Sequence, residues 1–461
     1  MGLRNESLAL WINGARIGLW HHAKGAADVV ELDRDWAQSA RAVPLLLSLS
    51  FPLGNESERI LSGDAVSSFF DNLLPESAHA RERLARRFGS PNTDAFSLLK
   101  ETGRDCAGAL QILPPDVEPA HEGVAAGMPL TDDEIAMRLR WASSRPAAGQ
   151  SPLPDWMQDD CRFSLAGAQD KFALLKWRDR WCVPSGSTAT THILKLPMGF
   201  IGARGTTDFR DSVDNEWLCL KIFRAFGLET ADADIECIGG QRVLAVERFD
   251  RRWDESGERL HRLPQEDFCQ ALGVPAVRKY ESEGGPGLRE LFACLQQSDE
   301  AQKDRRTLLA SQILLWMLRS TDAHAKNFSL RLLPQSRFCL APFYDIVSAW
   351  PLMGDGPDQW RLTSIRMAMA LLGRNRHYHA ERIEARHFMS TAERVGLSPD
   401  EALAVMEEIV AATPAVMSAM ESIIPPGFSE RTAQSILAGL ALSAKRLDAR
   451  LDARRRSRGN A

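Results

Sequence analysis

The sequence lacks an apolar run of the length that spans a bilayer. Its first twenty residues also lack the apolar core that follows the basic start of a signal peptide. Both absences argue against secretion and membrane insertion. We therefore expect a cytoplasmic protein with no membrane partner.

The sequence also lacks a CxxC pair. Scattered cysteines in a chain of 461 residues are typical of buried, reduced thiols, and they argue against disulfides or structural zinc. His377 and His379 lie close together, but no acidic or cysteine ligand stands beside them, so we expect no metal site there. The eight cysteines are at positions 106, 161, 182, 219, 237, 269, 294 and 339.

The chain has no large charge excess, because 56 basic and 61 acidic residues leave a net charge of −5. This balance argues against nucleic-acid binding by the whole surface, although a local basic patch is not excluded. Arginines gather in the tail Lys445–Arg458, which we interpret as a solvated helix end rather than a nucleic-acid contact. The length and a hydrophobic content of 44% favour two or three globular domains.

The most informative stretch lies between residues 306 and 350. An apolar helical run ends at Arg319, and a polar segment, Ser320–Asn327, follows it. Two strand-like runs come next, 328–333 and 337–342, and the Pro-Gln-Ser sequence between them predicts a hairpin.

Two acidic residues and one amide converge if this hairpin forms. A hairpin brings its ends together, so Asn327 and Asp345 should be neighbours, and Asp322 is on the same loop as Asn327. Phosphoryl transfer by a protein kinase needs such a set. One Asp accepts the hydrogen of the substrate hydroxyl, while an Asn and a second Asp hold magnesium. The alternative interpretation is a turn that Asp322 caps and Asn327 closes.

Lys195 is a candidate for an anion site. In the strand-like segment 191–196 it lies on the face opposite to the neighbouring leucines. A lysine on an inner face needs an anionic partner, either a nucleotide phosphate or a carboxylate such as Glu216 in the following helical run. The alternative is a solvated surface lysine.

Two small-residue turns have features of phosphate loops. The turn within Arg162–Lys171 leaves backbone N–H groups that could face phosphate oxygens, with a plain hairpin as an equal alternative. The turn Gly103–Leu110 superficially resembles a phosphate loop, but no Lys-Ser or Lys-Thr pair follows Gly108, so we interpret it as structural.

Strand patterns dominate the first half of the chain and helical patterns the second. We expect a hairpin around Asn13-Gly14, a strand at Leu45–Leu53 and a helical region at Ser62–Leu99. A connector at 113–155 carries one helical patch near Asp132–Trp141. Further strands are expected at 172–176, 181–183, 191–196 and 244–251, and helices at 266–272, 287–297, 305–319, 380–395, 399–421 and 429–454.

Seven motifs, in this order, resemble the HipA family of bacterial serine/threonine-protein kinases, the toxins of type II toxin–antitoxin pairs. The motifs are SLAGAQDK, THILKLP, NEWLCLKI, VERFDR, LPQEDFCQALG, STDAHAKNFS and FYD, and FFDNLLPES and ETGRDCAGAL extend the likeness toward the amino terminus. The resemblance implies an α+β, two-lobed, divergent protein-kinase-like fold with an α/β amino-terminal domain and an all-helical carboxy-terminal domain. We expect a HipA N-terminal subdomain at 1–115, a kinase N-lobe-like subdomain at 116–258 and a helical kinase domain at 259–461.

The resemblance also implies roles for single residues, with ATP and Mg²⁺ as cofactors. Asp322 would be the catalytic base, and Asn327 and Asp345 the magnesium ligands. Ser164 would be autophosphorylated, which would place about two negative charges beside the ATP phosphates, drive the loop out of the site and silence the enzyme. The residues implied to bind ATP are Lys195 at the phosphates, Glu247 and Phe249 at the adenine through their backbone, Gln265 at the border of the nucleotide, and Ser164, Ala166, Gly167, Ala168, Lys171 and Tyr344.

The chain departs from ordinary protein kinases in three places. Ile346-Val347 rather than Phe-Gly follows Asp345, no His-Arg pair precedes Asp322, and the phosphate turn has one glycine. These departures match the divergent family pattern and remove the expectation of a standard activation loop.

The resemblance implies several partners. They are a HipB-like helix-turn-helix antitoxin, operator DNA reached mainly through that antitoxin, a dimer within the toxin–antitoxin complex, and an aminoacyl-tRNA synthetase as protein substrate. Two alternatives stay open. One is a small-molecule or lipid kinase of the same fold, and the other is a nucleotide-binding co-repressor that acts with a DNA-binding antitoxin.

Overall fold

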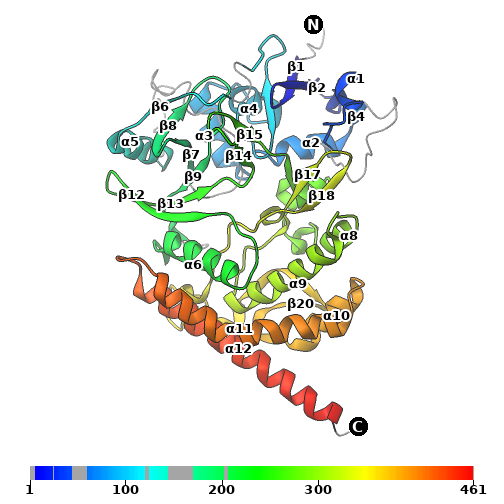
Figure 1. Cartoon of the computed structure of the whole chain (residues 1–461), viewed down its shortest axis with the longest axis vertical. Helices are drawn as coiled ribbons and strands as arrows, with labels where there is room; N and C mark the ends of the chain where they lie inside the picture. Colours follow the sequence, from blue (N-terminus) through cyan, green and yellow to red (C-terminus); the bar gives the residue numbers. More distant parts are fainter. Residues whose placement is uncertain are drawn as a thin grey trace. The chain divides into compact units, whose positions relative to one another are not determined.

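The computed structural model describes residues 6–23, 25–43, 60–119, 124–143, 169, 171–201 and 206–459, with backbone only for 142–143 and 452–459. The chain forms two compact units, which are described separately (Figure 1). The first comprises Met1–Leu196, Glu236–Lys279 and Ser329–Phe338, and the second comprises Pro197–Ile235, Tyr280–Phe328 and Cys339–Ala461. The predicted strand at Leu45–Leu53 lies outside the described residues.

A five-stranded antiparallel sheet opens the first unit, in the order β4-β3-β2-β1-β5. Its central hairpin turns at Asn13-Gly14, and positive φ values of 45° and 80° there confirm the predicted turn. Trp20 is fully buried and stacks on Phe70 of the adjoining helix, with ring centroids 3.6 Å apart. The strands are β1 (Glu6–Ile12), β2 (Ala15–His22), β3 (Val29–Leu32), β4 (Ile60–Ser62) and β5 (Leu110–Leu113).

The helical region predicted at 62–99 is confirmed and contains three helices. Ser77 and Asp94 cap two of them by accepting hydrogen bonds from backbone N–H groups, and Gly89 ends a helix in the left-handed conformation. A short helix, α1 (Arg34–Ala37), precedes them, and the three are α2 (Asp64–Asp71), α3 (Ala78–Phe88) and α4 (Ala95–Thr102).

The second sheet of the first unit has the order β12-β13-β9-β7-β8-β6, and α5 (Asp132–Ser143) packs on it. Phe172, Leu174, Leu194 and Leu196 form the core against Ile135 and Leu139 of this helix. These positions confirm the predicted strands and the side of β9 on which the leucines lie. The strands are β6 (Gly127–Pro129), β7 (Lys171–Trp177), β8 (Arg180–Pro184), β9 (His192–Lys195), β12 (Ala233–Ile238) and β13 (Gln241–Glu247).

Two smaller sheets complete the first unit. The pair β14 (Arg251–Trp253) and β15 (Leu260–Arg262) follows β13. The predicted hairpin is confirmed as β17 (Ser329–Leu333) and β18 (Arg337–Leu340), and β16 (Gln265–Asp267) adds a third strand beside β17. The short helix α7 (Phe268–Ala271) follows β16, with Asp267 as its N-cap.

The second unit is mainly helical, and with the sheets of the first unit it confirms the α+β class. It also contains the strands β10 (Gly199–Ile201), β11 (Thr207–Phe209), β19 (Arg366–Leu372) and β20 (Arg376–His379). The sequence did not predict β19, because a short apolar run fits a strand and a buried helix equally well. The helices are α6 (Ser212–Ala225), α8 (Leu288–Leu295), α9 (Ala301–Leu318), α10 (Ala385–Arg394), α11 (Pro399–Ile423) and α12 (Glu430–Gly459).

Helix α11 corrects one expectation of the sequence analysis. This helix of 25 residues is long and apolar enough, by length and composition alone, to cross a membrane. However, its buried residues recur at helical spacing, and the helix packs against α6, α9, α10 and α12. This arrangement is that of a core helix in a globular unit.

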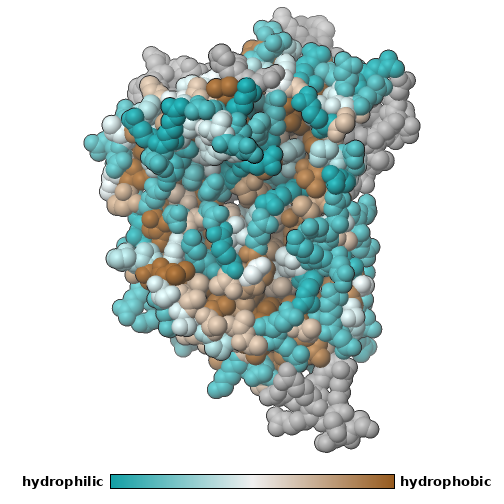
Figure 2. Space-filling model, viewed as in Figure 1, coloured by the Kyte–Doolittle hydropathy of each residue, from teal (hydrophilic) through white to brown (hydrophobic). Residues whose placement is uncertain are grey.

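The face of the molecule in Figure 2 is mostly hydrophilic, with hydrophobic residues in separate patches. Scattered exposed apolar side chains are normal on protein surfaces and need no partner to explain them. The large apolar residues with the greatest exposure are Val277, Ile60, Met128, Leu442 and Phe200.

His192 on β9 should make the stability of the protein depend on pH. Burial, with a smaller contribution from Lys176, lowers the pKa of His192 from 6.5 to about 4. The unfolded chain binds this proton near its ordinary pKa while the folded chain does not, so the free energy of unfolding falls as pH falls through that window. We predict that the free energy of unfolding of His192→Gln, measured with urea, falls by ~2 kcal/mol less than that of the wild type over this pH range. Equal losses of stability in the wild type and in His192→Gln would show that His192 does not cause this pH effect.

Candidate active site

The loop that carries Asp322 begins where α9 ends. Arg319 takes a left-handed conformation with φ of 56°, and the N–H of Ser320 donates to the carbonyl of Leu315 at 2.9 Å. This closes the last helical turn in the way that glycine usually does. The Arg319 guanidinium is buried between the rings of Trp316 and Trp350, and burial lowers its pKa to about 10. The start of the loop is therefore fixed by the helix end.

Backbone and amide hydrogen bonds fold the loop into a tight turn. The carbonyl of Asp322 accepts from the N–H of His324 at 2.9 Å and from Nδ2 of Asn327 at 2.7 Å. The turn-closing role considered for Asn327 is thus present. It uses the amide nitrogen, so it is compatible with a role of the amide oxygen as a metal ligand.

Two aromatic side chains hold the Asp322 carboxylate. The Tyr280 hydroxyl donates to Oδ1 of Asp322, and Nε2 of His324 lies 3.7 Å from the same oxygen. The rings of Tyr280 and His324 are edge to face, with centroids 4.9 Å apart. His324 is buried, while the Asp322 side chain is 51% exposed. The carboxylate therefore contacts buried groups on one side and solvent on the other.

Asp345 lies beside this loop, as the hairpin argument predicted. The hydroxyl of Tyr344 donates to the carbonyl of Lys326 at 2.8 Å, which joins the residues adjacent to Asp345 and Asn327. Asp345 itself has a φ of 56°. A left-handed conformation is uncommon for a residue other than glycine, and it is tolerated best by Asp and Asn. Such backbone strain gathers at functional sites.

The segment after Asp345 is anchored by α6. The side-chain amide of Asn215 accepts from the N–H of Ser348 at 2.7 Å and donates to its carbonyl at 2.8 Å. The Ser348 hydroxyl donates to the carbonyl of Leu318 at 2.7 Å. All of these groups are buried. Asn215 therefore ties the Asp345 segment to α6, and Ser348 ties the same segment to the end of α9, from which the Asp322 loop starts.

In the first unit, two lysines predicted to bind ATP lie side by side. Lys171 on β7 pairs directly with Lys195 on β9, so both side chains lie on the same face of the sheet. Lys195 is 7% exposed, which excludes the solvated-surface alternative. The amide of Gln169 donates to the carbonyl of Leu196 at 2.6 Å and fixes the end of the predicted phosphate turn. Of that turn, Ser164, Ala166, Gly167 and Ala168 lie outside the described residues.

The residues predicted at the adenine also lie in the first unit. Glu247 ends β13, Phe249 follows it, and Nε2 of Gln265 is 3.5 Å from Oδ2 of Asp250. These residues therefore come close together. Glu216 is buried on α6 in the second unit. Its pairing with Lys195 stays a prediction.

The donor set fits a hard metal ion with nucleotide. Asn327 and Asp345 offer amide and carboxylate oxygens, which Mg²⁺ prefers, and Mg²⁺ usually completes its shell with phosphate oxygens and water. Within the described part of the chain, no group of three or more His, Cys, Asp or Glu side chains is arranged to hold a metal ion.

Sequence reasoning did not find Tyr280, His324 or Asn215. Tyr280 is 42 residues from its partner, and Asn215 is 133 residues from Ser348. A polar residue in a buried helix face was the single available signal for Asn215, because such a residue needs a hydrogen-bond partner.

The anchor at Asn215 generates a stability prediction. Asn215→Ala leaves the N–H and carbonyl of Ser348 buried without this partner, which should lower the free energy of unfolding by ~2–4 kcal/mol. Ser311→Ala is the matched control, because Ser311 is equally buried but donates to Leu308 within its own helix. Its cost should be ~1 kcal/mol or less. Equal losses in denaturant unfolding would contradict the anchoring role.

Two family models and two relatives match most of the chain. The HipA N-terminal domain model matches residues 8–113, and the HipA-like C-terminal domain model matches residues 163–417. The protein Y4mE of Sinorhizobium fredii is 36% identical over 346 residues, which cover 74% of this chain and 77% of that protein. The serine/threonine-protein kinase toxin HipA of Shewanella oneidensis is 26% identical over 408 residues, which cover 86% of this chain and 85% of the toxin.

A solved structure shows the same fold. In the complex of Shewanella oneidensis MR-1 HipA with HipB and operator DNA, the similar chain has a TM-score of 0.75 and 24% identity, with 96% of this chain and 98% of that chain covered. Since the C-terminal family model alone spans more than half of the 461 residues, the chain belongs to the HipA family.

Proposed function

We propose that the protein is an ATP-dependent serine/threonine protein kinase and the toxin of a HipA/HipB-like toxin–antitoxin pair. The observation that carries the proposal is the convergence of Asp322, Asn327 and Asp345 on two adjoining segments of the second unit. The sequence relationship to a HipA toxin that is named as a serine/threonine-protein kinase supports it.

In the proposed reaction, Asp322 accepts the hydrogen of the substrate hydroxyl as the phosphoryl group transfers. Asn327 and Asp345 would hold Mg²⁺, which neutralises charge on the phosphates when it is bound. Lys195 and Lys171 would contact the phosphates. The backbone of Glu247 and Phe249 would meet the adenine edge, with Gln265 and Tyr344 at the border of the nucleotide.

The partners and the control of the enzyme belong to the same proposal. A HipB-like antitoxin would bind the chain and bring it to operator DNA, as the composition of the Shewanella oneidensis complex suggests. The protein substrate would be an aminoacyl-tRNA synthetase in the cytoplasm. Autophosphorylation of Ser164 would switch the enzyme off, because the added charge repels the ATP phosphates.

Loss of either carboxylate should stop phosphoryl transfer. We predict that Asp322→Asn and Asp345→Asn each lower the rate by on the order of a hundredfold or more while the fold stays intact, as measured by transfer of radiolabel from ATP to protein. Asp358→Asn is a matched control, because Asp358 is an exposed aspartate of the same unit outside the site. Full activity of either site variant would refute the mechanism, and label on a metabolite alone would select the small-molecule kinase.

Tyr280 should position the catalytic base. Tyr280→Phe removes the donor to Asp322 and frees the carboxylate to rotate, so kcat should fall by roughly five- to tenfold with little change in the KM for ATP. Tyr378→Phe, a second tyrosine of the same unit on β20, should leave kcat unchanged. An unchanged or faster Tyr280→Phe enzyme would show that the bond does not serve catalysis.

A further inference from the structure

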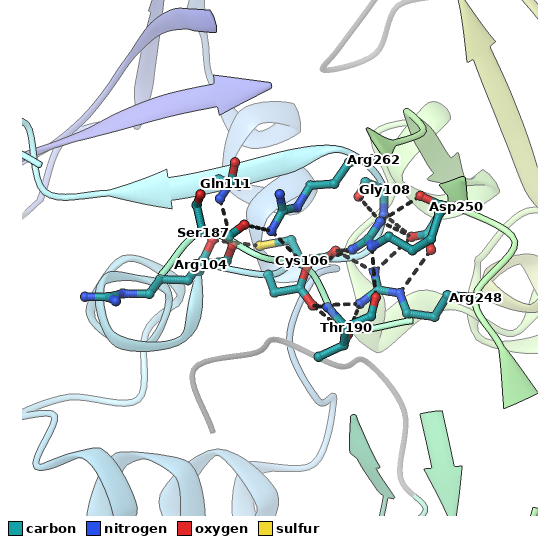
Figure 3. A network of polar contacts seen from close by, with 12 residues as sticks. Arg104, Cys106, Gly108, Gln111, Ser187, Thr190, Arg248, Asp250 and Arg262 are labelled. Carbon is teal, nitrogen blue, oxygen red and sulfur yellow. Dashed lines mark hydrogen bonds and ion pairs between the residues drawn. The ribbon is translucent and has the colours of Figure 1, made fainter. Parts of the chain in front are cut away.

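Five charged residues form a cluster inside the first unit, and we call it the buried charge cluster. Its members come from the turn after α4 and from the stretch that runs from the end of β13 to the end of β15, and Thr190, two residues before β9, bonds to them (Figure 3). Each member is 7% exposed or less. Its members are Asp105, Arg248, Asp250, Arg251 and Arg262.

Asp105 is the acceptor at one end of the cluster. Its Oδ2 accepts from the Thr190 N–H at 3.0 Å, from the Thr190 hydroxyl at 2.6 Å and from Arg248 at 3.1 Å. Its Oδ1 accepts from Arg251 at 2.9 Å, and Arg262 lies 3.5 Å away. Thr190 also accepts from Arg248 through its hydroxyl at 2.9 Å, so it bridges the carboxylate and the guanidinium.

Asp250 is the acceptor at the other end. It accepts from Nε and an NH2 group of Arg248 at 3.0 and 2.9 Å, and from the N–H of Gly108 at 2.6 Å. Nε2 of Gln265 is also within reach of it. The guanidinium of Arg248 is therefore held between Asp250 and Thr190, as Figure 3 shows.

The arginines also fix the backbone of the turn after α4. Arg248 donates to the carbonyl of Cys106 at 2.7 Å, and Arg251 donates to the carbonyls of Cys106 and Gly108 at 3.0 and 2.8 Å. Gly108 has a φ of 76°, and a Cβ placed there would lie 2.8 Å from the carbonyl oxygen of Gln265. The turn thus touches the start of β16 with no room for a side chain.

The charges are ionised although they are buried. Burial alone would raise the pKa of Asp105, but Arg251, Arg248 and Arg262 outweigh it and lower that pKa far below its ordinary value. Burial lowers the pKa of Arg262 to about 10. Buried ion groups seldom add net stability over apolar side chains, and their best-attested use is to fix one geometry.

The geometry that this cluster fixes is that of the predicted adenine contacts. Arg248 stands between Glu247 and Phe249, and Asp250 and Gly108 both contact Gln265. The chain segment 247–250 and the first residue of β16 are therefore positioned by a turn that lies some 140 residues earlier in the sequence.

We propose that the turn Arg104–Gly108, through the buried charge cluster, is a positioning element for the adenine of ATP. This inference rests on the proposed kinase function. The amino-terminal part of the chain thereby completes the nucleotide site without touching the nucleotide. Binding of adenine should depend on the cluster, whereas binding of the phosphates, which Lys171 and Lys195 are proposed to contact, should not.

The test compares two neighbouring threonines in the full-length protein. Thr190→Val removes a hydroxyl that bridges Asp105 and Arg248, whereas Thr191→Val removes an equally buried hydroxyl that bonds the N–H of Lys176 and the ring of His192. Kd values for Mg-ATP and for inorganic triphosphate with magnesium are measured by calorimetry well below the unfolding temperature. Thr190→Val should weaken the binding of ATP by roughly five- to tenfold, the size of one typical hydrogen bond, and leave the binding of triphosphate unchanged.

Two further variants test the role of the Thr190 hydroxyl and provide a second test if Thr190→Val does not fold. Thr190→Ser retains the hydroxyl and should restore the wild-type ATP affinity. Gly108→Ala removes no charge but displaces Gln265, and it should also weaken ATP selectively if Thr190→Val does not fold. Equal behaviour of Thr190→Val and Thr191→Val, or a parallel loss of ATP and triphosphate, would overturn the proposal. A wild-type protein that binds neither ligand would instead reject the kinase function.

Discussion

The geometry of the candidate site in the second unit depends on holding two separate chain segments against the end of one helix. Helix α9 ends in a left-handed residue, Arg319, and the Asp322 loop starts there. Asn215 of α6 holds the backbone of Ser348, whose hydroxyl bonds to Leu318 at this helix end, and Tyr344 bonds to Lys326 in the loop. Each bond satisfies backbone groups that would otherwise be buried at a cost. The two segments that carry Asp322, Asn327 and Asp345 therefore have one arrangement rather than many.

The local features of this site could be predicted from the sequence. Short-range periodicity and turn residues predict helix α9, its end at Arg319 and the hairpin that follows. From the hairpin alone it follows that Asn327 and Asp345 approach each other. The same kind of pattern placed Lys195 opposite the leucines of its strand. These predictions succeeded because each depends on neighbours within a few residues.

The long-range features could not be predicted in this way. Nothing near Asp105 indicates that its partners are Arg248 and Arg251, because the pairs are separated by 143 and 146 residues. The turn around Asp105 was correctly interpreted as structural, but its place in an ion cluster depends on tertiary packing. Strand β19 was missed because its apolar run suits two kinds of element. The predicted phosphate turn around Ser164 lies outside the described residues, so it remains a prediction.

The pairing of Lys171 with Lys195 has a thermodynamic consequence. Two cations directly opposite each other on neighbouring strands disfavour the pairing of those strands. If ATP binds on that face as proposed, its phosphates would screen the two charges from each other and strengthen the pairing of the two strands. Ligand occupancy and the cohesion of β7 with β9 are then linked by mass action. The first unit should accordingly resist unfolding more strongly in a solution rich in polyphosphate than in one that lacks it.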